Sequence, residues 1–307
     1  MIVAAGLSPA WQQILLLDAL APGAVNRARE AHWCGSGKVL NVGIGLAHLG
    51  AESRTIAPLG GPARTAIEQE FRALGVPLRA IPCREPTRVC TTILDRATGT
   101  TTELVENARP LADDEIEAYV TAFAAEAEDA KIVVLTGSLP DGVPSSFYRD
   151  LLERTPATAV LDARGPELLA ALVRRPLVVK PNREELARTV GRDLADDAAL
   201  LAAMRSLNEA GAQWVVVTSG KDAVWVTSAA ETLRLLPPAV ANVVNPIGCG
   251  DALAAGLAVA IERGDTVTDA VRHGMAAAAD RLRLLLPGRL DPMRVSAIAA
   301  RISFERL

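Results

Sequence analysis

The middle and C-terminal parts of the chain alternate short apolar runs with longer stretches of helical periodicity. The apolar runs stop at turn or polar residues and lie at Ile132–Leu135, Ala159–Leu161, Leu177–Val179 and Trp214–Thr218. Stretches with helical spacing lie at Ser145–Glu153, Arg183–Thr189 and Ala198–Ala210. Short continuous apolar runs bounded by turns are typical of strands buried on both faces. The alternation therefore predicts an α/β fold with a mostly parallel sheet covered by helices, in which the polar residues after the strands face a ligand.

The N-terminal part of the chain departs from this rhythm. The segments concerned lie at Leu15–Leu17, Arg27–Trp33, Val89–Leu94 and Thr101–Val105. The last two are rich in Thr and separated by a turn, which predicts a β-hairpin, and all four are expected to form a small separate sheet. No internal repeat or long linker divides the chain. We therefore expect one domain, residues 1–307, with lid segments at roughly residues 11–33 and 87–106.

Composition narrows the class of protein. Of the 307 residues 50% are hydrophobic, 22% are charged and 3% are aromatic, and the formal net charge is -4. This high apolar fraction with a modest charge is not typical of a disordered protein. Its mild acidity gives no electrostatic reason to bind nucleic acid or an anionic membrane. No run approaches the roughly 20 apolar residues of a membrane-spanning helix, so we expect no membrane partner.

The N-terminus and the cysteines bear on location. The first residues, MIVAAGLSPAW, contain no basic stretch, so no secretory signal is expected. The four cysteines form no CxxC pair and lie near no His at metal-ligand spacing, which argues against a structural zinc site. Reduced thiols in a cytoplasmic protein are the favoured interpretation. Cys249 could have a lowered pKa at a helix start, although a packing role is favoured.

The segment most informative about chemistry is Asn245-Pro246-Ile247-Gly248-Cys249-Gly250-Asp251. It follows a strand-like run at Val243–Val244 and opens an Ala-rich helix. Backbone N–H groups at a helix start lack intrahelical partners and lie at the positive end of the helix dipole, so they bind anions. A carboxylate beside them makes sense if Asp251 deprotonates a hydroxyl while the N–H groups stabilise a phosphoryl group. The alternative is an acidic first-turn residue that only stabilises the helix, and the motif alone favours neither.

A second glycine-containing segment, Gly35–Val42, also precedes a predicted helix, Val42–Leu49, which ends at Gly50. Its spacing is not that of a Walker A phosphate-binding loop. It presents glycines together with Lys38 and Asn41 at the entry to a helix. These groups are suited to holding hydroxyls or a phosphate.

Together these segments resemble the phosphofructokinase B (PfkB) carbohydrate kinase family, most closely its 1-phosphofructokinases and tagatose-6-phosphate kinases. The matching motifs are Gly137–Pro144 (GSLPDGVP), Lys180–Leu186 (KPNREEL), Asn245–Asp251 (NPIGCGD) and Ala24–Arg27 (AVNR). The resemblance covers almost the whole chain. It implies a ribokinase-like three-layer α/β/α sandwich with a mostly parallel central sheet and a small β-sheet lid. It further implies a kinase that uses ATP and Mg²⁺, and a homodimer formed through the lid sheet.

The resemblance also implies a role for each matching position. Asp251 would be the catalytic base, with an anion hole formed by Gly248, Cys249 and Gly250. The residues implied to bind the nucleotide are Lys180, Asn182, Glu185, Ser219 and Gly220, and Glu185 would hold Mg²⁺ through water. The residues implied to bind the acceptor are Gln12, Arg27, Gly37, Lys38, Asn41, Arg88 and Glu106. The two arginines would hold a phosphate on the acceptor, although a solvent-facing role for both stays open.

Departures from the family pattern cluster on the acceptor side. Gln12 stands where the family has an Asp that binds sugar hydroxyls, Ser36 and Val39 replace glycines, and Val105 alters a conserved NEPGP segment. The residues for phosphoryl transfer all remain. We therefore expect an active kinase for a sugar or sugar phosphate, with a free sugar or a nucleoside as alternative acceptors. The other alternative is a non-catalytic sensor of a sugar phosphate or nucleotide. No early G-x-G-x-x-G supports a dehydrogenase.

Overall fold

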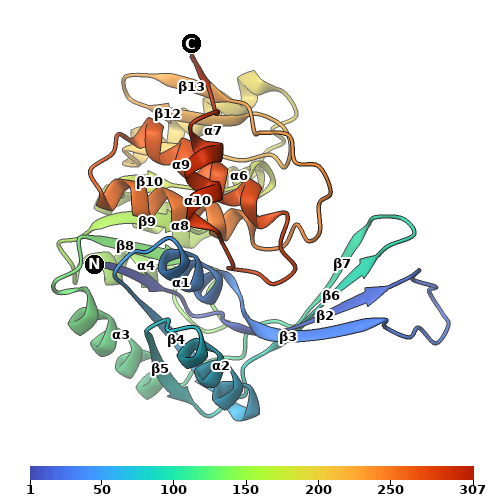
Figure 1. The fold of residues 1–307 in the computed structure, drawn as a ribbon. Coiled ribbons are helices and arrows are strands. Elements are labelled where there is room, and N and C mark those ends of the chain that lie inside the picture. Colours follow the sequence, from blue (N-terminus) through green and yellow to red (C-terminus); the bar gives the residue numbers. More distant parts are fainter.

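The structure, a computed structural model that describes residues 1–307, contains a large and a small β-sheet (Figure 1). The large sheet has ten strands in the order β14-β13-β12-β11-β10-β9-β8-β1-β4-β5. Its strands are β1 (Ile2–Ala5), β4 (Ser53–Gly60), β5 (Leu78–Cys83), β8 (Ile132–Thr136), β9 (Thr158–Asp162), β10 (Val178–Val179), β11 (Trp214–Val217), β12 (Val224–Ser228), β13 (Thr232–Leu235) and β14 (Phe304–Arg306). The strands from β11 to β5 pair in parallel, which confirms the predicted sheet. The antiparallel edge of β12, β13 and β14 was not predicted.

Helices cover both faces of the large sheet, which confirms the three-layer sandwich (Figure 1). They are α1 (Lys38–His48), α2 (Gly61–Ala73), α3 (Asp113–Ala127), α4 (Phe147–Leu152), α5 (Gly165–Ala171), the short 3-10 helix Leu172–Arg174, α6 (Arg183–Val190), α7 (Asp197–Ala210), α8 (Cys249–Glu262), α9 (Val267–Arg281) and α10 (Pro292–Ala299). Because side chains alternate along a strand, Val3 of β1 packs in the core formed with α3 to α7, and Ile2 packs in the core formed with α1, α8, α9 and α10. None of the helices is long and apolar enough to cross a membrane.

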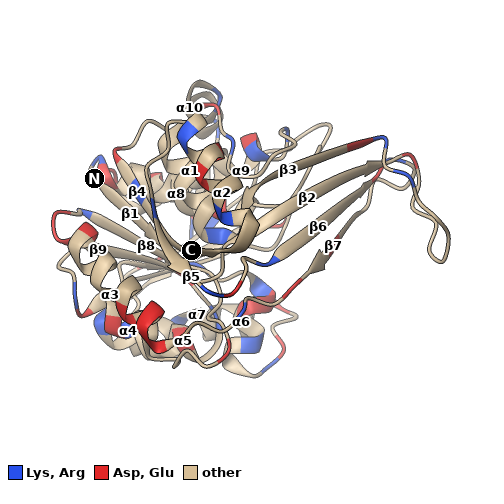
Figure 2. Ribbon diagram, turned by 90° about the horizontal axis from the view of Figure 1, so that it is seen from below, with Lys and Arg blue, Asp and Glu red and all other residues tan.

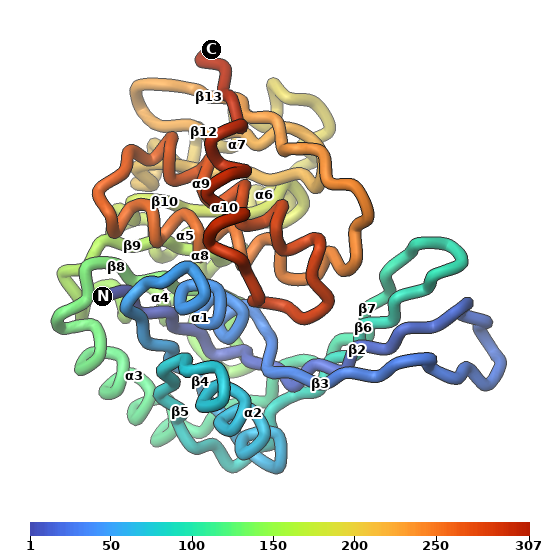
Figure 3. Tube along the Cα trace, viewed as in Figure 1, coloured from blue at the N-terminus to red at the C-terminus, as the bar shows by residue number.

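The small sheet forms a lid that extends away from the body of the molecule. Its strands are β2 (Ala10–Leu17), β3 (Glu30–Ser36), β6 (Val89–Asp95) and β7 (Thr101–Val105), in the order β3-β2-β6-β7. The predicted hairpin is the antiparallel pair of β6 and β7. Two arms, β2–β3 and β6–β7, project side by side from the body (Figures 1 and 3). Figure 2 shows that the lid strands carry few charged residues.

Helix α1 begins at Lys38 and not at the predicted Val42. Its N-cap is Gly37, with φ of 82°, in a region of backbone conformation that favours glycine. This conformation lets the chain turn directly from the end of β3 into the helix. The earlier start places Lys38 and Asn41 in the first turn, where the Lys38 side chain reaches Asp162 at the end of β9 and the Asn41 side chain reaches Asp251 in α8.

Candidate active site

Helix α8 begins at the glycine-rich segment, as predicted. Gly248 is its N-cap, with φ of 86° in the left-handed region, and Cys249 is its first residue. The prediction of a strand just before it is wrong, because residues 236–246 join neither sheet and Val243 is 53% exposed. Asn245 holds this segment in place instead, since its Nδ2 donates a hydrogen bond to the carbonyl oxygen of Leu285 at 2.8 Å.

Asp251 lies in the first turn of α8 and is buried. Its Oδ2 accepts a hydrogen bond from Asn41 Nδ2 at 2.7 Å. Burial, and then the neighbouring Asp162 carboxylate, raise the pKa of Asp251 to about 6, although Lys38, the Asn41 hydrogen bond and Lys180 oppose the rise. A buried carboxylate with a pKa near neutrality is suited to accept a proton from a hydroxyl. Burial also distinguishes Asp251 from a solvent-facing acid that only stabilises a helix.

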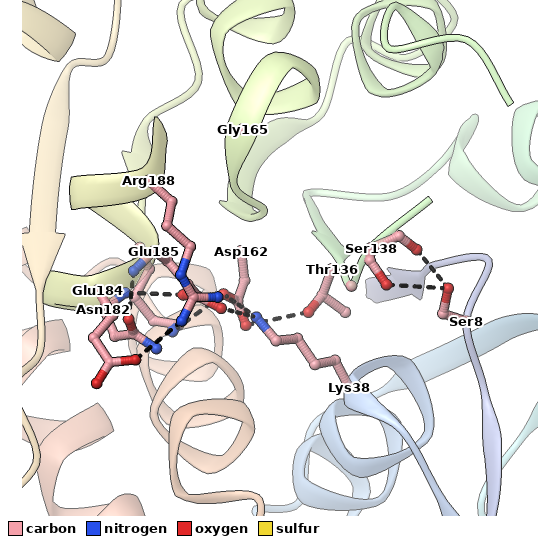
Figure 4. Close-up of polar contacts among 12 residues, drawn as sticks. Ser8, Lys38, Thr136, Ser138, Asp162, Gly165, Asn182, Glu184, Glu185 and Arg188 are labelled. Carbon is pink, nitrogen blue, oxygen red and sulfur yellow. Dashed lines mark hydrogen bonds and ion pairs between the residues drawn. The ribbon is translucent and has the colours of Figure 1, made fainter. Parts of the chain in front are cut away.

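A buried charge cluster forms where β8, β9 and β10 end (Figure 4). Asp162, the last residue of β9, is fully buried, and its Oδ1 lies 3.2 Å from Lys180 Nζ and 3.0 Å from Lys38 Nζ. Thr136 at the end of β8 donates a hydrogen bond to its Oδ2 at 3.2 Å. Burial acts to raise the pKa of Asp162, but the ammonium groups of Lys180 and Lys38 hold it below its ordinary value. Sequence reasoning did not name Asp162 as a site residue, although its position directly after an apolar run was the available signal.

Asn182 and Glu185 form a reciprocal cap at the start of α6. Asn182 Oδ1 accepts from the Glu185 N–H at 2.8 Å, and Glu185 Oε2 accepts from the Asn182 N–H at 2.9 Å. The other oxygen, Glu185 Oε1, lies 3.2 Å from Lys38 Nζ (Figure 4). Lys38, which was predicted to bind the acceptor, therefore bridges the carboxylates of Asp162 and Glu185. Glu185 is itself one of the predicted nucleotide-binding residues.

The donor set at this strand edge fits a magnesium ion shared with a nucleotide. No group of three or more His, Cys, Asp and Glu side chains is arranged as a complete metal site. In sites that act on nucleotides, Mg²⁺ is typically held by one or two carboxylates, water molecules and the substrate phosphates, so a complete set of protein ligands is not needed. Asp162 and Glu185 supply two carboxylates joined through the same ammonium group of Lys38.

A cavity of about 130 Å³ lies beside the charge cluster. It is lined by Ser8, Lys38, Arg88, Gly137, Ser138, Ala163, Arg164 and Glu185. Three of these residues are cationic, which suits a phosphate group. Arg164 follows Asp162 by two positions and was not anticipated from the sequence. A larger surface hollow, about 690 Å³ along α3, contains none of the groups described above.

Arg88 is held in the wall of this cavity by main-chain oxygens. Its guanidinium donates to the carbonyl oxygens of Ser8 at 3.0 Å, Pro9 at 3.2 Å and Glu106 at 3.0 Å. These bonds occupy three of its five N–H groups and fix its direction. The Glu106 carboxylate accepts from the Val89 N–H at 3.0 Å, so it extends the pairing of β6 and β7 at their end.

Gln12 and Gly37 lie where the lid joins the body. Gln12 is buried in β2, and its Nε2 donates to Thr92 Oγ1 on β6 at 2.7 Å. A Cβ added to Gly37 would lie 2.7 Å from the carbonyl oxygen of Ser8, so a side chain does not fit there. Ser8 is one of the residues that line the cavity, so this close approach lies beside its wall.

The remaining predicted residues lie in different surroundings. The segment between β2 and β3 lies at the far end of the lid (Figure 3). Arg27 belongs to this segment and is exposed, and no hydrogen bond or ion pair joins it to the other acceptor residues. Ser219 and Gly220 follow β11, next to Thr218, which pairs with Asn182. Burial raises the pKa of Cys249 to about 11, so the helix start does not make it a reactive thiolate.

Known proteins resemble this chain in sequence and in fold. Residues 12–282 match the sequence family described as pfkB family carbohydrate kinase. A 1-phosphofructokinase from Xanthomonas campestris is 33% identical over 262 residues, which are 83% of this chain and 82% of the relative. A D-tagatose-1-phosphate kinase from Klebsiella oxytoca is 31% identical over 219 residues, 70% of this chain and 71% of the relative. The tetrameric inhibited form of Escherichia coli phosphofructokinase-2 shares the fold with a TM-score of 0.88 at 24% identity, over 97% of this chain and 98% of that one.

Proposed function

The chain belongs to the pfkB family of carbohydrate kinases, and from this premise we propose that it phosphorylates a ketohexose 1-phosphate, with Asp251 as the general base. Sugar-phosphate kinase activity with ATP follows from the family and the named relatives. The roles of individual residues are our proposal. The observation that carries them is the buried Asp251 carboxylate at the start of α8, which is hydrogen-bonded to Asn41 and has a pKa raised by burial to about 6.

In the proposed reaction, Asp251 accepts the proton of the acceptor hydroxyl while the hydroxyl oxygen attacks the γ-phosphorus of ATP. The bond from this phosphorus to the β,γ-bridging oxygen breaks, and ADP leaves with the electron pair. The N–H groups of Cys249 and Gly250 stabilise negative charge on the transferred phosphoryl group. Lys180 Nζ lies 3.6 Å from the position that a Cβ on Gly250 would take, so its positive charge adds to theirs.

The 130 Å³ cavity supports a phosphorylated acceptor. The guanidinium groups of Arg88 and Arg164 supply forked donors suited to a phosphate, and the hydroxyl groups of Ser8 and Ser138 lie in the same wall. Two relatives are named for ketohexose 1-phosphates, fructose and tagatose, which favours that class over a free sugar. Gln12 offers both a donor and an acceptor where a carboxylate only accepts, so the preferred hydroxyl geometry is expected to differ from that of relatives with Asp.

We assign Mg²⁺ to the edge formed by Asp162 and Glu185, with Glu185 acting through water. When bound there, Mg²⁺ neutralises charge on the nucleotide phosphates. Lys38 lies between the two carboxylates and reduces their mutual repulsion before the ion arrives. Asn182 keeps Glu185 oriented through the reciprocal cap.

A panel of acceptors tests this function. The purified chain is incubated with Mg²⁺, ATP and each of fructose 1-phosphate, tagatose 1-phosphate, fructose 6-phosphate, tagatose 6-phosphate, free fructose and a nucleoside, and ADP release is measured. We expect the highest kcat/KM with a ketohexose 1-phosphate. A higher value for a free sugar or a nucleoside overturns the acceptor assignment. Thermal stabilisation by ligands with no ADP release over the whole panel would instead support the sensor alternative.

We also propose that the lid sheet pairs with a second copy of this chain. Trp33 and Leu104 are 45% and 58% exposed, and the strand register places both on one face of the sheet. Trp11 stacks on Trp33 with ring centroids 5.9 Å apart, which extends the apolar face. The opposite face is already covered, since Ile14 packs near Leu285. A matching apolar face on a second copy would remove this surface from water.

Sedimentation velocity tests the dimer. The wild type is expected to sediment as a dimer at micromolar concentration, and a double change, Trp33→Ser with Leu104→Ser, as a monomer. Val173→Ser is the control, because Val173 is 67% exposed on the body of the molecule and far from the lid strands in sequence. A monomeric wild type contradicts the assignment.

All four cysteines are free, which supports our proposal of a cytoplasmic location.

A further inference from the structure

Arg281 is the last residue of α9 and the largest fully buried side chain in the molecule. Its hydrogen bonds go to main-chain oxygens alone: Nη1 donates to the carbonyl oxygen of Leu284, and Nη2 to that of Leu285 at 3.3 Å. A buried guanidinium normally needs a carboxylate or a full set of acceptors to offset its lost hydration. Arg281 has neither, which makes it an expensive residue to keep inside a core.

The unpartnered group of Arg281 points at the start of α8. Its Nε has no hydrogen-bond acceptor, and it lies 3.6 Å from the position that a Cβ on Gly248 would take. Asn41 Nδ2 lies 3.5 Å from the same position. Gly248 is the N-cap of α8, so two side-chain donors and the free N–H groups of the helix start converge on one turn.

Arg281 is also tied to that turn through a shared oxygen. The carbonyl oxygen of Leu285 accepts from Arg281 Nη2 and from Asn245 Nδ2, and Asn245 lies three residues before Gly248. A substitution of Arg281 therefore affects the start of α8 in two ways: it removes the nearby positive charge, and it alters the hydrogen bonds to the Leu285 carbonyl oxygen that Asn245 shares. Although burial lowers the pKa of Arg281, an arginine in a protein stays protonated at neutral pH.

We propose that Arg281 is a positioning residue for phosphoryl transfer: its buried guanidinium holds a fixed positive charge behind the Gly248 turn and strengthens the hold of the α8 N-terminus on the transferred group. The inference rests on the proposed function. Negative charge that develops on the phosphoryl group is stabilised most by charges that need no reorganisation, and a buried guanidinium fixed at its Nη atoms is such a charge. Its effect is expected on the transition state more than on bound substrates.

Three variants test the proposal. Arg281→Met removes the charge and keeps much of the volume, Arg281→Lys keeps a charge, and Arg272→Met is the matched control. Arg272 also lies in α9 and donates to two main-chain oxygens, those of Ile302 and Ala299, and in addition to the Asp269 carboxylate. We expect Arg281→Met to lower kcat about 10- to 100-fold, with KM for ATP and for the acceptor changed less than about threefold. Arg281→Lys should recover most of the loss, and Arg272→Met should keep the wild-type kcat.

Thermal unfolding separates this role from a purely structural one. Because an uncompensated buried charge costs stability, Arg281→Met is expected to melt at the wild-type temperature or above it. A lower melting temperature with unchanged kcat of the folded enzyme, or equal loss in Arg281→Lys and Arg281→Met, overturns the proposal.

A binding measurement keeps the proposal distinct from the proposed function. ADP with aluminium fluoride, Mg²⁺ and fructose 1-phosphate mimics the transferred phosphoryl group, and its thermal shift is compared with that of ADP and Mg²⁺ alone. We expect Arg281→Met to lose most of the additional shift and to keep the shift from ADP. Failure of the wild type to release ADP with any acceptor refutes the proposed function, whereas the Arg281 inference fails if wild type and variant respond equally to aluminium fluoride or if neither responds.

Discussion

The large sheet and the lid sheet hold their site residues in opposite ways. At the end of the large sheet, Asp162 and Lys180 are 0% and 3% exposed and are fixed by ion pairs of opposite charge. In the lid, the neutral Gln12 is buried and donates a hydrogen bond to Thr92, and the outer face exposes Trp33. The residues assigned to phosphoryl transfer are therefore held in place by the core of the large sheet. Gln12, the residue assigned to the choice of sugar hydroxyl, lies on an arm whose outer face still lacks a cover.

The charge balance of the buried cluster explains the state of its proposed base. Three carboxylates, those of Asp162, Glu185 and Asp251, share two ammonium groups, those of Lys38 and Lys180. Asp162 contacts both ammonium groups, and its pKa is held down by them against its burial. Asp251 forms no ion pair with either, and its pKa rises. The carboxylate without an ion-pair partner is thus the one prepared to take a proton.

The comparison of the two sheets predicts that the largest loss of kcat comes from a change of the proposed base, Asp251. Asp251→Asn keeps the shape and a partner for Asn41 but cannot accept a proton at neutral pH. We expect kcat to fall about 10²- to 10⁴-fold, with little change in KM for ATP. ADP release under saturating substrates measures the effect, and a thermal shift with ATP checks that the variant still binds nucleotide. Turnover within tenfold of the wild type would remove Asp251 from the role of general base.

Asp162→Asn is expected to have the next largest effect, because it leaves the buried ammonium group of Lys180 and the partly exposed one of Lys38 without their shared carboxylate. Breaking a buried pair in this way costs about 3 kcal/mol or more in the free energy of unfolding, and kcat should fall on the order of 100-fold. Asp280→Asn is the matched control, since Asp280 is also fully buried and pairs with Arg294 at 2.7 Å. The control should lose stability and keep its kcat when folded, so equal losses of kcat in both variants would contradict a specific role for Asp162.

The dependence of activity on pH follows from the raised pKa of Asp251. The base works when deprotonated, so kcat/KM should be about half of its maximum near pH 6, should level off above about pH 7, and should approach a tenfold fall per pH unit below about pH 5. Because the Asp162 carboxylate helps to raise the pKa of Asp251, Asp162→Asn should move this acid limb to lower pH. Rates measured between pH 5 and pH 8 with wild type and variant check both statements. A limb that moves to higher pH in the variant would contradict the electrostatic account.

The sequence predicted the centre of the large sheet well because the evidence there is local. Ile132–Thr136 is apolar up to its last residue, and a short continuous run of this kind is typical of a strand buried on both faces. The cap formed by Asn182 and Glu185 spans three residues and is visible as a motif. The glycines before Asp251 likewise predict the start of α8.

Partners distant in the sequence could not be predicted in the same way. Lys38 meets Asp162 across 124 positions, and no local pattern specifies that contact. Val243–Val244 has high strand propensity, but it has no neighbouring strand to pair with. Arg281 lies in a stretch with Arg283 that resembles a solvated helix end, yet its side chain is fully buried in the folded chain. Burial of a charged residue is a tertiary property.

A smaller and more selective effect is expected in the lid from Gln12→Asp. The carboxylate cannot donate to Thr92 Oγ1 and presents only acceptors to a sugar hydroxyl. We expect the ratio of kcat/KM between two ketohexose phosphates to change about tenfold, since hydroxyl recognition depends on paired donors and acceptors. Gln69→Asp is the control, because Gln69 is exposed in α2, on the body of the molecule. A uniform change over all acceptors would show that Gln12 supports the lid without selecting the acceptor.

The smallest effect is expected from Cys249→Ala, although Cys249 lies at the centre of the proposed anion hole. The hole uses the N–H group of Cys249, and Ala presents the same group at the same helix position. Since burial raises the pKa of the thiol to about 11, less than a thousandth of it is thiolate at pH 7, and its loss removes no charge. We expect kcat within about twofold of the wild type and slow alkylation of Cys249 by iodoacetamide at pH 7. A tenfold loss of kcat would mean that the Cys249 side chain itself contacts a substrate. The proposal that Cys249 contributes only its main-chain N–H group would then be wrong.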